Sequence, residues 1–141
     1  MFVDPVLVRI NEGMALPGPQ RRDLFERIRA GTDDPLHVCV LAHSMADVQD
    51  DVHEELVWDE RALAAIGSLT DARLAEAGVP FTVAALYPSL YLNLADCHRR
   101  LGDPARAREY LEQARSRMGA LGDDDYGNLI RSGLEDLERQ L

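Results

Sequence analysis

Apolar residues recur at intervals of three and four positions through most of the chain, and no segment alternates apolar and polar residues long enough to form a strand. This spacing predicts an all-α protein. The expected helices run from residue 5 to a break at 16–19, over about 20–30, 36–48, 52–66, 82–101 and 104–118, and from about 125 onward. A shorter helical piece is expected between about 70 and 78.

Three Asp-Pro pairs predict helix starts, because aspartate caps a helix and proline suits its first turn. These pairs are Asp4-Pro5, Asp34-Pro35 and Asp103-Pro104. Gly102 precedes the third pair, so residues 102–104 predict a sharp corner between two helices. Pro88 lies inside the helix expected at 82–101, and we expect it to kink that helix.

The two helices that flank this corner carry a sequence pattern. It reads Tyr91-x2-Leu94-Ala95-x2-His98, then Gly102-Asp103, then Ala107-x3-Leu111-x2-Ala114. The pattern resembles a tetratricopeptide repeat (TPR), in which two antiparallel helices pack closely. Ala95 and Ala107 leave room where the two backbones approach each other. The family usually has glycine where Ala95 stands and a large aromatic residue where His98 stands.

A weaker copy of the pattern lies upstream and reads Val38-x2-Leu41-Ala42-x2-Met45. Its second helix departs from the family, because Glu55 falls where a small residue belongs and Asp59 where a large apolar one belongs. The corresponding alanines, Ala42 and Ala95, are 53 positions apart. Since TPR units usually repeat every ~34 residues, we expect an insertion between the two copies.

The resemblance implies a TPR-like α-α superhelix of antiparallel helix hairpins, closed by a C-terminal capping helix. The whole chain, 1–141, is expected to form one such domain. Its expected parts are an N-terminal hairpin at 1–31, a degenerate repeat at 34–67, an insertion at 68–86, the best repeat at 87–120 and the capping helix at 124–141.

The resemblance also implies a function, because the first helix of each TPR hairpin lines a concave groove that binds peptides or proteins. The matching positions are Ser89, Leu92, Asn93, Asp96, Arg99 and Arg100 in the better repeat and Cys39, His43, Ala46 and Asp47 in the weaker one. Family members often use asparagine at the place of Asn93 to bind a ligand's backbone. The alternative for Asn93 is an ordinary surface asparagine. The expected function is that of a non-catalytic scaffold or adaptor.

The net charge of the chain argues against some classes of partner. The formal net charge is -10, and such a surface repels nucleic acids and anionic lipids, so neither is expected as a partner. The acidic run from Asp47 to Glu60 favours a basic protein or peptide, unless it is only a solvated face. The first residues do not resemble a signal peptide and no stretch is apolar enough to span a membrane, which favours a cytoplasmic location.

Catalytic motifs are missing from the sequence, which has no nucleophile elbow, phosphate-binding glycine loop or H-E-x-x-H helix. We therefore expect neither an enzyme nor a cofactor.

Two alternatives to the scaffold function stay open. Cys39, His43 and Asp47 recur every four residues on one helical face, which suits a metal or thiol site. The arginine-rich helix from Arg106 to Arg117 could instead meet the acidic segment of a second copy and form a homodimer.

Overall fold

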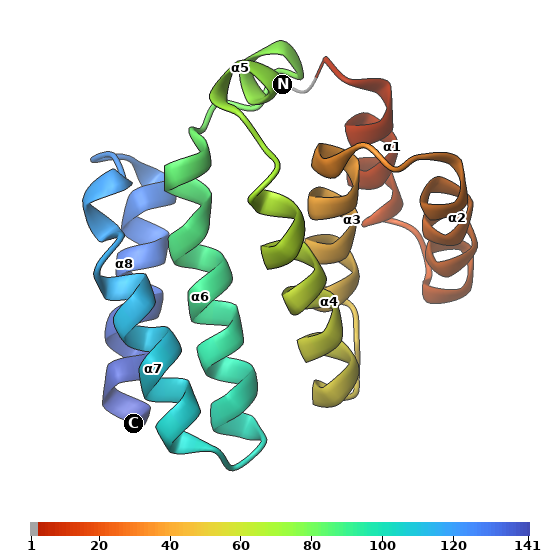
Figure 1. Cartoon of the computed structure of the whole chain (residues 1–141). Helices are drawn as coiled ribbons and strands as arrows, with labels where there is room; N and C mark the ends of the chain where they lie inside the picture. The colour runs from red at the N-terminus through yellow and green to blue at the C-terminus, as the bar shows by residue number, and fades with distance from the viewer. Residues whose placement is uncertain (1–2) are drawn as a thin grey trace.

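The computed structural model describes residues 3–141, and this part of the chain is helical and contains no strand. Figure 1 shows its helices in chain order. They are α1 (Pro5–Gly13), α2 (Gly18–Gly31), α3 (Pro35–Asp47), α4 (Val52–Ile66), α5 (Asp71–Glu76), α6 (Val83–Arg100), α7 (Pro104–Arg115) and α8 (Asp125–Gln140), with a 3₁₀ turn, η1 (Met118–Ala120), between the last two. The all-α prediction is confirmed.

The helices pack as hairpins laid side by side. Helix α3 packs along α4 and α6 packs along α7, and α4 then contacts α6, which joins the two hairpins. Helices α1 and α2 form a further pair against α3, while α8 lies against both α6 and α7 (Figure 1). The short α5 crosses one end of this arrangement, close to the N-terminal end of α1.

The helix starts follow the capping residues in the sequence. Side chains of Asp4, Asp34 and Asp103 accept hydrogen bonds from the first turns of α1, α3 and α7, and a proline follows each of them. At the α6–α7 corner Gly102 has φ +80°, and the amide of Asp103 donates to the carbonyl of His98 at 2.9 Å. This is a Schellman C-cap, which needs the left-handed conformation that glycine adopts freely.

Some boundaries differ from the expected ones. Helix α2 begins at Gly18 instead of residue 20, because Pro17 already occupies the N-cap position and Pro19 fits the first turn. Helix α7 ends at Arg115, and the residues expected to extend it to 118 form a turn leading into η1. Helix α6 runs unbroken from Val83 to Arg100 with Pro88 inside it, so it begins within the range 68–86 that the sequence assigned to the insertion.

Two apolar clusters form the core, and α6 contributes to both. Leu90 packs in the cluster built mainly from α1 to α5, whereas Leu92 packs in the cluster built from α6, α7 and α8. Ala95 and Ala107 are fully buried in the α6–α7 hairpin. Small residues at these places let the two helices approach closely, as the repeat pattern predicts.

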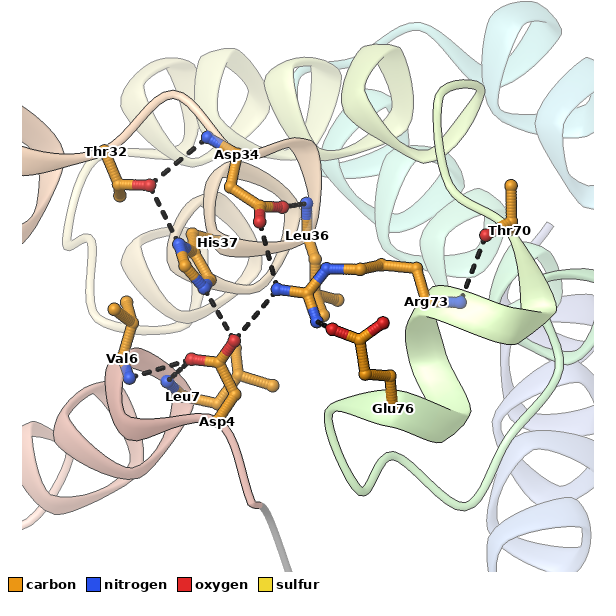
Figure 2. A network of polar contacts seen from close by, with 10 residues as sticks. All are labelled: Asp4, Val6, Leu7, Thr32, Asp34, Leu36, His37, Thr70, Arg73 and Glu76. Carbon is orange, nitrogen blue, oxygen red and sulfur yellow. Dashed lines mark hydrogen bonds and ion pairs between the residues drawn. The ribbon is translucent and has the colours of Figure 1, made fainter.

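A polar network ties α1, α3 and α5 together (Figure 2). Oδ2 of Asp4 lies 2.9 Å from Nε2 of His37 and 2.9 Å from Nη2 of Arg73. The same Arg73 nitrogen also donates to Oδ2 of Asp34 at 3.0 Å. One guanidinium on α5 therefore joins the two aspartates that cap α1 and α3. We call Asp4, Asp34, His37 and Arg73 the capping network.

Ionisation of Asp4 depends on this network. Burial opposes the charged form, but hydrogen bonds from His37, Arg73 and the amides of Val6 and Leu7 outweigh it and hold the pKa of Asp4 well below its ordinary value. The pKa of Asp34 is lowered in the same way, with burial again opposed by its bonds to Arg73 and to the amide of Leu36. Both carboxylates are therefore charged at neutral pH.

Candidate functional site

A groove of about 500 Å³ lies between α3, α6 and α8. Helix α3 contributes two residues near its C-terminal end, α6 contributes residues from its middle, and α8 contributes residues along most of its length. The lining residues are His43 and Asp47 from α3, Ser89, Leu92, Asn93 and Asp96 from α6, and Tyr126, Leu129, Ile130, Gly133, Asp136, Leu137 and Gln140 from α8. We call this feature the α3–α6–α8 groove.

Six residues that the sequence placed in a binding groove line this one together: His43, Asp47, Ser89, Leu92, Asn93 and Asp96. Arg99 and Arg100 are not among the lining residues. Both instead bind the carboxylate of Asp96, Arg99 through Nη2 at 2.8 Å and Arg100 through Nε at 2.9 Å. The two arginines therefore hold one wall residue of the groove in position.

Cys39 and Ala46, the other two expected groove residues, point elsewhere. Both are buried, and Cys39 lines an adjoining apolar cavity of about 220 Å³ together with Leu36, Leu74 and Leu90. This cavity shares His43, Ser89 and Tyr126 with the groove. Burial raises the pKa of the Cys39 thiol to about 11, so it stays protonated at neutral pH.

Helix α8 supplies the part of the groove that the sequence analysis missed. Its apolar positions predicted a capping helix, and Ile130 and Leu137 are indeed buried against the core. Leu129, however, is 69% exposed and lies on the groove wall. Leucine on an otherwise polar helix face was the available signal, but the side on which α8 packs is decided by tertiary contacts.

The charged side chains that line the groove are carboxylates. Asp47, Asp96 and Asp136 line it, and no arginine does. Nε2 of His43 lies 4.0 Å from Oδ2 of Asp47, one helical turn away. A groove lined by carboxylates and by an exposed leucine suits a segment that carries both positive charge and an apolar side chain.

A second cluster of polar residues is buried at the contact between α4 and α6. The thiol of Cys97 lies 3.1 Å from Oε2 of Glu55 and 3.5 Å from Oδ2 of Asp59. Asp59 is 1% exposed and Cys97 is fully buried. Nη2 of Arg100 forms an ion pair with the same Glu55 oxygen at the outer edge of the cluster.

Burial changes the ionisation of this cluster. It raises the pKa of Asp59 to about 7, helped by the nearby charges of Glu55 and Asp47 and opposed by the Cys97 thiol and Arg100. Burial and the adjacent carboxylates also raise the pKa of Cys97. The sequence predicted that the acids from Asp47 to Glu60 form one surface run, and for Asp59 that prediction is wrong, because its side chain is buried.

The metal site that the sequence left open as an alternative, Cys39 with His43 and Asp47, is not the cluster of ligand atoms that the fold brings together. Among residues 3–141, one set of three ligand types has its ligand atoms within 4.8 Å of one another, and it consists of Glu55, Asp59 and Cys97. Cys39, His43 and Asp47 share a helix but form no such set within that range.

None of the helices in residues 3–141 is both long enough and apolar enough to cross a membrane.

No protein-family model, curated protein or solved structure matches this chain. The resemblance to tetratricopeptide repeats therefore rests on the residues of the chain itself, and the two sites are interpreted from their geometry.

Proposed function

We propose that this chain is a non-catalytic, TPR-like scaffold whose α3–α6–α8 groove binds a basic peptide segment of a partner protein in the cytoplasm. The observation that carries the proposal is the composition of the groove. Residues from three helices far apart in the sequence line one concave surface, with three aspartates and the exposed side chain of Leu129.

The order in which the helices pack supports the repeat assignment. In a TPR array the second helix of one hairpin contacts the first helix of the next. Here α4, the second helix of one hairpin, contacts α6, the first helix of the next. Helices α3, α6 and α8 then hold equivalent places in the array, and these are the three helices that line the groove.

One carboxylate of the groove is left without an arginine partner and supports a basic ligand. Asp96 is shared between Arg99 and Arg100, and Asp136 pairs with Arg139, so each of these carboxylates already has a cationic neighbour. Asp47 has only the weak contact with His43. A cationic side chain of a ligand would bind most favourably near Asp47, while an apolar side chain beside it would cover Leu129.

The experiment that tests the proposal is affinity selection of short random peptides on the immobilised full chain. We expect the enriched peptides to combine arginine or lysine with a large apolar residue, and their binding to weaken as salt is added. Enrichment of acidic peptides, or of no sequence class, would contradict the proposal.

A matched pair of variants locates the binding surface. Leu129→Ser removes an apolar side chain that is 69% exposed inside the groove, and Val3→Ser removes one that is 70% exposed elsewhere. The first change should lower the affinity for a selected peptide by about tenfold or more, as expected for loss of an interfacial anchor. The second should leave its affinity unchanged. Equal effects of both changes would show that the groove is not the binding site.

A further inference from the structure

The cluster of Glu55, Asp59 and Cys97 has the geometry of a metal-binding site. A zinc ion with bonds of about 2.3 Å to sulfur and about 2.0 Å to oxygen, in tetrahedral geometry, holds those two atoms about 3.5 Å apart. The Cys97 sulfur lies 3.1 Å from the Glu55 oxygen and 3.5 Å from the Asp59 oxygen. The two separations are thus close to the edges of a zinc coordination tetrahedron.

An unpartnered oxygen in the cluster is independent evidence for a ligand. The Asp59 carboxylate points at Cys97 through Oδ2, while its other oxygen, Oδ1, has no hydrogen-bond partner although it is buried. Asp59 itself is only 1% exposed. Leaving a buried carboxylate oxygen without a partner is costly, and the single thiol proton of Cys97 is shared between two carboxylates. A cation bound by both oxygens of the Asp59 carboxylate would lie beside Cys97 through Oδ2 and would also give the unpartnered Oδ1 a partner.

The charges around the cluster suit a divalent cation. Two carboxylates and a thiolate carry three negative charges when they bind a metal. Arg100, ion-paired with Glu55, balances one of them, and a divalent ion would balance the other two. The Glu55 side chain is 19% exposed and that of Arg100 is 35% exposed, so an ion can reach the cluster from this edge.

From this arrangement we propose that Glu55, Asp59 and Cys97 form a divalent transition-metal site, for which zinc is the best-matched ion, between the α3–α4 and α6–α7 hairpins. Thiolate with carboxylate ligands favours zinc over the oxygen-preferring magnesium and calcium ions. The metal links α4 to α6 and so fixes one hairpin against the next. The site is separate from the α3–α6–α8 groove, and its assignment does not depend on what the groove binds.

Titration of the full-length, metal-free, reduced protein with zinc and with cobalt tests this site. We expect one zinc ion per chain by calorimetry, a zinc-dependent rise in Tm, and an absorption band from thiolate-to-cobalt charge transfer when cobalt is bound. Cys97→Ser should abolish the band, and Asp59→Asn should weaken zinc binding by at least about tenfold. Cys39→Ser, at the other buried cysteine, is the matched control and should change neither.

Two outcomes would overturn the proposal. The first is that wild-type protein binds no stoichiometric zinc and shows no charge-transfer band with cobalt. This outcome is measured on wild-type protein alone, so it does not depend on whether a variant folds. The second is a band that survives Cys97→Ser and disappears in Cys39→Ser, which would place the metal at Cys39, His43 and Asp47. Circular dichroism of each variant confirms that a lost band does not come from a lost fold.

Discussion

The Cys97 sulfur lies 3.5 Å from Oδ2 of Asp59, across the contact between α4 and α6, and neither residue is more than 1% exposed. In the repeat pattern a large apolar side chain is expected where Asp59 stands. The contact between the two hairpins is therefore built around a buried polar pair, and we expect it to be the part of the fold that responds most strongly to solution conditions.

The first prediction concerns pH and Asp59. Its pKa is about 7 in the folded protein and near the ordinary 3.8 in the unfolded chain, so the folded state retains a proton that the unfolded state releases between these values. In the presence of EDTA, the free energy of unfolding should therefore fall as pH rises from about 4 to 7 and then level off. The expected loss is on the order of 2–4 kcal/mol.

Asp59→Asn isolates this effect, because the amide has the same shape and does not titrate. Urea unfolding of both proteins across the pH range gives the comparison. The difference between wild type and variant should change between pH 4 and 7 and stay constant above that window. Parallel pH profiles would mean that Asp59 is not buried in the way described.

The second prediction concerns the capping network. Asp4→Asn keeps a side chain that can cap α1 but removes the charge that binds His37 and Arg73. At pH 7 it should lower the free energy of unfolding by about 1–3 kcal/mol, as for loss of a partly buried ion pair. Asp123→Asn, at an exposed turn position, should be close to neutral.

The loss of stability in Asp4→Asn should also depend on pH in the acid range. The folded-state pKa of Asp4 is lowered, so its contribution is fully present above the unfolded value of 3.8 and is lost as pH falls below it. The stability difference between wild type and Asp4→Asn should thus shrink between about pH 4 and pH 2. A difference that stays constant over this range would show that the ion pairs do not stabilise the fold.

The third prediction tests the close approach of α6 and α7. Ala107 is fully buried between them, and Ala107→Leu should overpack the hairpin and cost ~1–3 kcal/mol of unfolding free energy. Ala105→Leu, two residues away on the exposed face of α7, should change stability by less than about 0.5 kcal/mol. Thermal or urea unfolding that finds the two variants equally stable would remove the packing argument.

Local signals predicted most of the helices. Asp-Pro pairs and Gly102 act within a few residues of the helix ends that they specify, so the sequence contains them directly. Helix α4 was predicted with the observed bounds, Val52–Ile66. By contrast, the start of α2 was placed two residues late, because Pro17 had been counted only as a break.

The sites were harder to predict because they depend on how helices pack. The groove residues on α3 and α6 followed from the repeat pattern, but those on α8 depend on which face that helix turns to the core. Asp59 carried a usable signal, since the pattern expected an apolar residue there. The neighbouring acids favoured a solvated surface instead, and the burial of Asp59 depends on the contact between α4 and α6.

The most direct test of the proposed function is NMR mapping of a basic peptide recovered by affinity selection, titrated into the isotope-labelled full chain. We predict that amide shift changes will concentrate at His43 and Asp47 on α3, Asn93 on α6 and Leu129 on α8. Shift changes centred instead on the separate surface pocket around Arg29 and Trp58, or too small to locate any surface, would contradict the account.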